Sequence, residues 1–77
     1  MLDLDREFDT DLGRKIRTHR RSQKLTQEQL AARMQLEGCD LTRSAIAKIE
    51  VGQRRISCRE MKNFCMVLGI AYAVLLD

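Results

Sequence analysis

One helix-start pattern occurs three times in this chain of 77 residues. The segment Leu25–Leu30 has a threonine in the N-cap position, a glutamine three residues later and apolar residues around them, which together form a capping box and a hydrophobic staple. Ile56–Met61 repeats both features around Ser57, and Leu41–Ile46 repeats the cap and the staple around Thr42. The chain also contains no proline and is rich in helix-forming residues. These features predict an all-α fold.

The starts, the glycine stops and the apolar spacing predict five helices. Their expected ranges are about Asp11–Ser22, the stretch after Thr26 to about Glu37, Thr42–Val51, Ser57–Leu68 and Tyr72–Leu76. A chain of this length has room for one small domain. We expect residues 11–77 to form that domain.

Residues 1–10 are predicted to be a separate, flexible and acidic arm. The first eleven residues contain five acidic side chains and one arginine, Arg6. Only Leu2, Leu4 and Phe8 could supply the apolar burial that offsets the entropy of ordering the arm. The alternative is that the arm folds back on the basic surface and weakens nonspecific binding.

The rest of the chain is basic, with thirteen Lys and Arg residues against six acidic residues in 12–77. A basic body can attract a polyanion, so nucleic acid and an acidic membrane surface are the candidate partners. The simpler alternative is that these cations only keep the protein in solution. No apolar run approaches the roughly 20 residues that span a bilayer, and the start has no signal-peptide core. We therefore expect a cytoplasmic protein without a membrane partner.

Catalytic and metal sites are not expected. The three cysteines, Cys39, Cys58 and Cys65, include no close pair, and His19 is the only histidine, which argues against a zinc site and for reduced thiols. Spacing supports no Ser/His/Asp grouping, and no glycine-rich phosphate loop is present. The sequence predicts neither an enzyme nor a cofactor.

The third predicted helix has two different faces when its residues are placed at about 100° each. One face is aliphatic, and the other carries Arg43, Ser44, Ala47 and Lys48. Arg and Lys can donate to guanine edges or phosphates, Ser can contact either, and a small residue lets the backbone approach a partner. The simpler alternative is an ordinary solvated face.

The flanking segments suit a phosphate backbone. Gln27 lies in the first turn of the second helix, where free backbone N–H groups favour phosphate. After the third helix, Gly52-Gln53-Arg54-Arg55 is a short basic loop that could follow a phosphate strand. A solvent-facing turn is the alternative for the loop.

Three segments resemble the XRE family of phage-repressor and Cro-like helix-turn-helix domains. They are LTQEQLA (25–31), SAIAKIEVGQR (44–54) and LGI (68–70), and the resemblance covers about residues 12–76. It implies a five-helix, lambda-repressor-like domain that binds operator DNA as a homodimer and regulates transcription as a repressor. The recognition helix would be Thr42–Val51.

The resemblance also assigns roles by motif position. The side chains that read bases would be Arg43, Ser44 and Lys48. The side chains that bind phosphates would be Gln27, Thr42, Gln53, Arg54 and Arg55. Arg20 would form a structural ion pair with Glu50, because truncating one partner would leave a partly buried charge.

The sequence departs from the family pattern between its second and third helices, where Gln35–Leu41 is longer than usual. If the second helix reaches Glu37, the remaining turn is of normal length; otherwise the loop could shift the recognition helix or touch DNA. Lys24 stands where glycine is preferred and would bear a left-handed backbone cost. Elsewhere, His19 replaces an apolar residue and Ile56 replaces a proline.

The chain ends in apolar residues that we expect mostly to fill the core, with any surplus forming a homodimer surface. They are Ile70, Tyr72, Val74, Leu75 and Leu76. We expect Cys65 in the core and Cys39 exposed in the longer turn. The alternative function is a protein-interaction module, such as an antitoxin or adaptor, that binds an unidentified protein and for which DNA binding is secondary.

Overall fold

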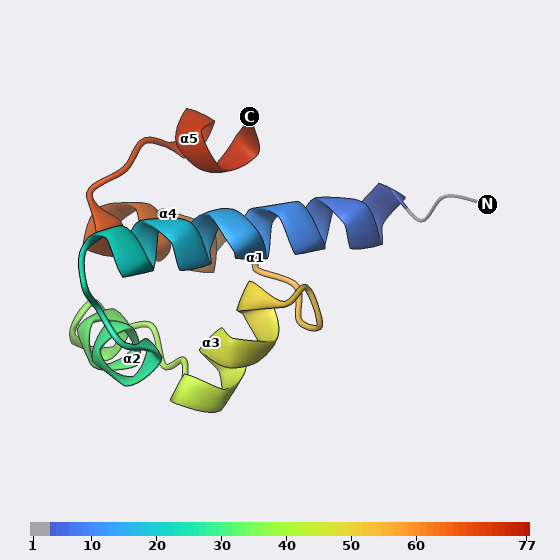
Figure 1. Ribbon diagram of the computed structural model, residues 1–77. Coiled ribbons are helices and arrows are strands. Elements are labelled where there is room, and N and C mark those ends of the chain that lie inside the picture. Colours follow the sequence, from blue (N-terminus) through green and yellow to red (C-terminus); the bar gives the residue numbers. More distant parts are fainter. Residues whose placement is uncertain (1–3) are drawn as a thin grey trace.

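The computed structural model describes residues 4–77, which fold into five α-helices and no β-strand. The helices are α1 (Leu4–Ser22), α2 (Gln27–Leu36), α3 (Arg43–Glu50), α4 (Cys58–Leu68) and α5 (Tyr72–Leu76). Figure 1 shows α1 crossing the middle of the molecule, with α5 on one side of it and α2 and α3 on the other. The prediction of an all-α, five-helix fold is confirmed.

Helices α2, α3 and α4 each begin with a side-chain N-cap, as their sequences predict. Thr26, Thr42 and Ser57 each accept a hydrogen bond from the backbone N–H three residues later, at 3.0, 3.1 and 3.1 Å. Thr26 and Ser57 complete capping boxes with Gln29 and Glu60. Each cap contributes about 1 kcal/mol, so local chemistry sets where α2, α3 and α4 begin.

Two side chains of the turn between α2 and α3, Cys39 and Leu41, are buried. Helix α2 reaches Leu36, and Gly38 follows with a φ of 79°, a left-handed conformation that glycine adopts without strain. Cys39 donates its backbone N–H to Met34, and it is 7% exposed, so the prediction that it is exposed is wrong. The turn folds inward because Leu41 belongs to the core. The longer segment is thus taken up by α2 and a compact turn.

Helix α1 begins at Leu4, seven residues before the predicted start at Asp11. Two acidic side chains, Asp5 and Glu7, lie in its first turn, where the helix dipole favours negative charge. Extending an existing helix is also less costly than nucleating one. Residues 4–10 of the expected arm are therefore helical, and residues 1–3 lie outside the described residues.

The C-terminal helix fills less of the core than the sequence suggested. Leu75 is buried and Ile70 is half-buried, but Tyr72, Val74 and Leu76 are 46%, 41% and 49% exposed. The expectation that most of these residues fill the core is wrong for those three. A helix of five residues can turn only one narrow face towards α1 and α4.

The turn after α1 contains the left-handed residue that the sequence predicts. Lys24 has a φ of 59°, as predicted for a position that favours glycine. None of the helices in residues 4–77 has both the length and the hydropathy of a bilayer span.

Gly13 allows α1 to approach the end of α3 closely. A Cβ atom at this position would overlap the carbonyl oxygen of Ile49 and lie 3.0 Å from backbone atoms of Glu50. Because these neighbours are backbone atoms, they could not move aside as a flexible side chain would. The contact between α1 and α3 therefore requires glycine here.

We expect Gly13→Ala to destabilise the protein by about 1–3 kcal/mol through overpacking at this contact. If α1 and α3 were not in close contact here, alanine would stabilise the helix by about 1 kcal/mol relative to glycine. The sign of the change in stability therefore shows whether the contact exists. Thermal unfolding followed by circular dichroism measures it, with Thr18→Ala on the exposed side of α1 as the control. A Gly13→Ala variant as stable as the wild type would contradict the close approach.

Candidate nucleic-acid interface

Helix α3 turns its polar face outward. Arg43, Ser44 and Lys48 are exposed, whereas Ile46 and Ile49 are 0% and 1% exposed on the opposite face. The aliphatic face packs against the core, so burial determines the direction of the polar face. The arrangement leaves two cations and a hydroxyl available to a partner outside the protein.

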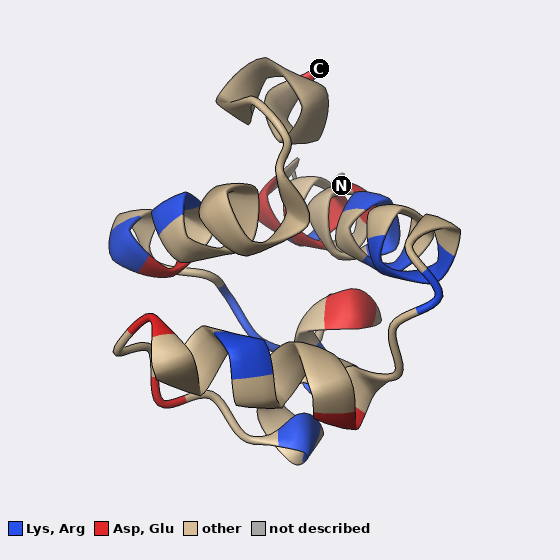
Figure 2. Ribbon diagram, turned by 90° about the vertical axis from the view of Figure 1, so that its left-hand side faces the viewer, with Lys and Arg blue, Asp and Glu red and all other residues tan. Residues whose placement is uncertain are grey.

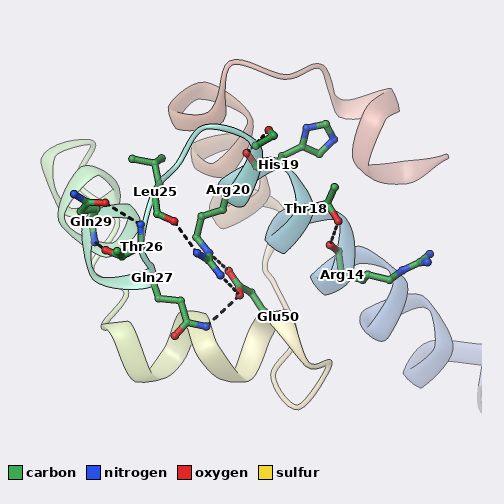
Figure 3. A network of polar contacts seen from close by, with 10 residues as sticks. Arg14, Thr18, His19, Arg20, Leu25, Thr26, Gln27, Gln29 and Glu50 are labelled. Carbon is green, nitrogen blue, oxygen red and sulfur yellow. Dashed lines mark hydrogen bonds and ion pairs between the residues drawn. The ribbon is translucent and has the colours of Figure 1, made fainter.

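A buried ion pair lies behind α3. The Arg20 guanidinium donates from Nε to Glu50 Oε2 at 2.7 Å and from Nη2 to Oε1 at 3.0 Å. The two side chains are only 8% and 1% exposed. The carboxylate hydrogen bond raises the pKa of Arg20 above its usual value. The pair predicted from the sequence is therefore present, and it is bidentate (Figure 3).

Two more hydrogen bonds extend this network to the start of α2. Arg20 Nη1 donates to the Leu25 carbonyl oxygen at 2.7 Å, and Gln27 Nε2 donates to Glu50 Oε1 at 3.1 Å. Figure 3 shows these groups converging from α1, the turn before α2 and the end of α3. The network therefore positions α3 relative to α1 and to the start of α2.

The predicted phosphate ligands at the helix starts keep some of their donors. Gln27 is half-buried, and its amide nitrogen carries two hydrogens, of which the Glu50 contact uses one. Thr42 is exposed, and its hydroxyl oxygen accepts from Ala45 while its O–H can still donate. Both positions are compatible with a phosphate at the surface.

The two arginines after α3 are already in ion pairs. Arg54 donates to both carboxylate oxygens of Glu60, at 3.2 and 3.1 Å. The pKa of Arg54 is raised by this hydrogen bonding. Burial tends to raise the pKa of Glu60, but hydrogen bonds from Arg54 and Ser57 outweigh it and leave that pKa lowered.

Arg55 is held by the first turns of α1. It contacts Asp5 through Nη2 at 3.1 Å and Asp9 through Nε at 3.2 Å. The Asp5 hydrogen bond is the main cause of the raised pKa of Arg55. The backbone of Thr10 also packs on Gly52, where a Cβ would lie 2.9 Å from the Thr10 Cα. The start of α1 thus contacts the basic loop. Gln53, in the same loop, is exposed.

A groove of about 560 Å³ separates part of α1 from α3. Its walls include two arginines that sequence reasoning did not assign, Arg17 and Arg21, together with Arg43. The only sequence signal was their spacing of four residues, which places them on one face of a helix. Figure 2 shows Lys and Arg residues on the C-terminal part of α1 and at the start of α3, with the acidic end of α3 between them.

The carboxylates, thiols and histidine of residues 4–77 are the side chains that could belong to a metal site. No group of three His, Cys, Asp or Glu side chains there could hold a metal ion. All three cysteines are free thiols, and burial raises the pKa of Cys65.

Comparison with known families agrees with the resemblance found in the sequence. A family model described as "Helix-turn-helix domain" matches residues 11–76, which is most of the chain. The searches found no matching curated protein and no matching solved structure.

We expect Arg20→Met to destabilise the fold by about 3–5 kcal/mol, because it leaves the buried Glu50 carboxylate without its cation. The double variant Arg20→Met/Glu50→Leu should be more stable than Arg20→Met alone, since neither charge is then buried unpaired. Urea unfolding measures both variants. Arg14→Met, which breaks an exposed pair with Asp11, is the control and should change stability little. Strictly additive losses in the double variant would contradict the coupling.

Proposed function

The chain belongs to the family of helix-turn-helix domains, and on that premise we propose that it binds double-stranded DNA sequence-specifically and acts as a transcriptional repressor of the XRE type. The DNA-binding domain comprises residues 11–77, and α3 enters the major groove. The observation that carries the proposal is the orientation of α3, whose exposed face presents Arg43, Ser44 and Lys48. These are the side-chain types that donate to base edges.

Phosphate contacts on either side of α3 would set the register of the domain on the duplex. Gln27 and Thr42 would contribute donors at the starts of α2 and α3, and Gln53 at the exposed loop. Arg54 and Arg55 would also bind phosphates, but each must first exchange a carboxylate for the phosphate.

The proposed repressor binds as a homodimer, because two recognition helices must reach half-sites about 34 Å apart. The exposed apolar side chains Tyr72, Val74 and Leu76 on α5 support this proposal, since they offer a surface that a second copy could cover. Repression would follow from occupying a site that other proteins need. We place the protein in the cytoplasm, where a DNA partner and reduced thiols are compatible.

Helix-turn-helix domains are typically not enzymes, and the proposed activity needs no cofactor. The competing function is a protein-interaction module, such as an antitoxin or adaptor. A salt titration against random-sequence duplex separates the two functions, because phosphate binding weakens steeply as salt rises. Absent duplex binding at low salt would reject the DNA-binding function.

We expect Arg43→Ala to weaken binding to a selected duplex by about 1–3 kcal/mol and to relax specificity at one base pair. The reason is that an arginine on the exposed face of α3 would donate to a base edge. Selection of bound duplexes from a random library, followed by anisotropy titration, measures both effects.

Removal of a phosphate contact should behave differently. Arg54→Ala should weaken all duplexes alike and lower the salt slope by about one. The change is best made in a Glu60→Gln background, so that no carboxylate loses its partner. Equal losses on every sequence from Arg43→Ala as well would contradict the assignment of Arg43 to base reading.

The double variant Asp5→Asn/Asp9→Asn should bind random-sequence duplex more tightly than the wild type. These carboxylates compete with phosphate for Arg55 and repel the DNA backbone. We expect a severalfold gain at low salt that shrinks as salt rises, measured by anisotropy.

Glu37→Gln/Asp40→Asn is the matched control, since it removes two exposed acids from the α2–α3 turn. Equal gains in the two double variants would show that only net charge matters. Such a result would reject a phosphate-binding role for Arg55.

A further inference from the structure

We infer that the groove between α1 and α3 is a second binding site for backbone phosphates of the DNA, with Arg17 and Arg21 as its ligands; the inference rests on the proposed function. It shifts part of the phosphate binding from the loop after α3 to the C-terminal half of α1.

The position of the two arginines follows from the contact at Gly13. Gly13, Arg17 and Arg21 are spaced by four residues, so they share one face of α1. Gly13 brings this face against the backbone of Ile49 and Glu50. Arg17 and Arg21 therefore continue along the same side of α1 and line the groove beside α3.

The opposite wall belongs to the recognition helix and follows the same spacing. Arg43, Ala47 and Val51 line it at intervals of four residues. Arg43 is also one of the proposed base-reading side chains. A duplex that lies on the exposed face of α3 would therefore bring a phosphate strand to the edge of this groove.

The charges that line the groove favour an anion. Arg20 is neutralised by Glu50, which leaves Arg17, Arg21 and Arg43 against Glu28. In residues 4–77 none of the ion pairs found involves Arg17, Arg21 or Arg43. A phosphate entering the groove would break no ion pair, whereas one that binds Arg54 or Arg55 must displace a carboxylate.

The chemistry of the walls fits a phosphodiester better than an apolar ligand. A guanidinium presents several N–H donors in a plane and binds phosphate oxygens in pairs. Ala47 and Val51 are the only apolar residues among the ten that line the groove. The second N–H of Gln27, another lining residue, adds a neutral donor at the start of α2.

The experiment measures the affinity of the full chain for a fluorescent random-sequence duplex over a range of salt concentrations. Each phosphate contact contributes about 0.9 to the slope of log K against log salt. Arg17→Gln/Arg21→Gln should therefore lower the magnitude of the slope by roughly two. Arg17→Lys/Arg21→Lys keeps the charges and should restore most of the slope.

Arg33→Gln/Lys62→Gln is the matched control. It removes two exposed cations, from α2 and α4, that do not line the groove. The control variant and the groove variant lose the same net charge. If the control changes the salt slope less, the extra loss in the groove variant comes from the position of Arg17 and Arg21. Melting curves of the variants establish that each is folded; Arg17 and Arg21 are exposed, and we expect their replacement to leave the fold intact.

Three results would overturn the inference. If the wild type binds duplex but the groove variant lowers the salt slope no more than the control variant does, the groove is rejected as a phosphate site. The proposed function is then unaffected. Polyglutamate that displaces the duplex from the wild type but not from the groove variant would assign the groove to an acidic protein. A wild type without duplex binding would reject both the groove and the proposed function.

Discussion

The bidentate pair between Arg20 and Glu50 fixes the position of α3 in the fold. It joins the end of α1 to the end of α3, and the same guanidinium reaches the carbonyl before α2. A buried pair of this kind adds little net stability compared with apolar packing, yet losing one partner is costly. Its main effect is therefore geometric, because α3 keeps one orientation relative to α1 and to the start of α2.

The second constraint is the division of the cations around α3 into two groups. Arg54 and Arg55 are held by carboxylates, whereas Arg17, Arg21 and Arg43 line a groove in which Glu28 is the one acid not already in an ion pair. The acidic start of α1 thus reduces the positive charge of the loop after α3. The positive charge of the groove between α1 and α3 is not reduced in this way. A polyanion would meet its lowest electrostatic cost near the C-terminal half of α1, next to the exposed polar face of α3.

Local features of the fold could be predicted from single segments. The caps at Thr26, Thr42 and Ser57 depend on residues within three positions of each other, and the two faces of α3 depend only on helical spacing. Most errors arose where packing between segments decided the outcome. Cys39 is buried because Leu41 draws the turn into the core. The early start of α1 is favoured locally by its acidic first turn, and a loop some forty-six residues away along the chain also contacts it. Tyr72 and Val74 are exposed because the short α5 packs only one face against α1 and α4.

The sequence alone determined the number of helices, the starts of α2, α3 and α4, the family resemblance and the set of polar side chains on α3. These follow from patterns within one helix or from motif matches. The sequence also suggested the Arg20–Glu50 pair through the resemblance. Only the tertiary structure decided which cations are engaged, which line a groove and which apolar residues stay exposed. The physical reason is that ion pairing and burial depend on distances between helices, and the packing at Gly13 and the ends of α1 and α3 sets those distances.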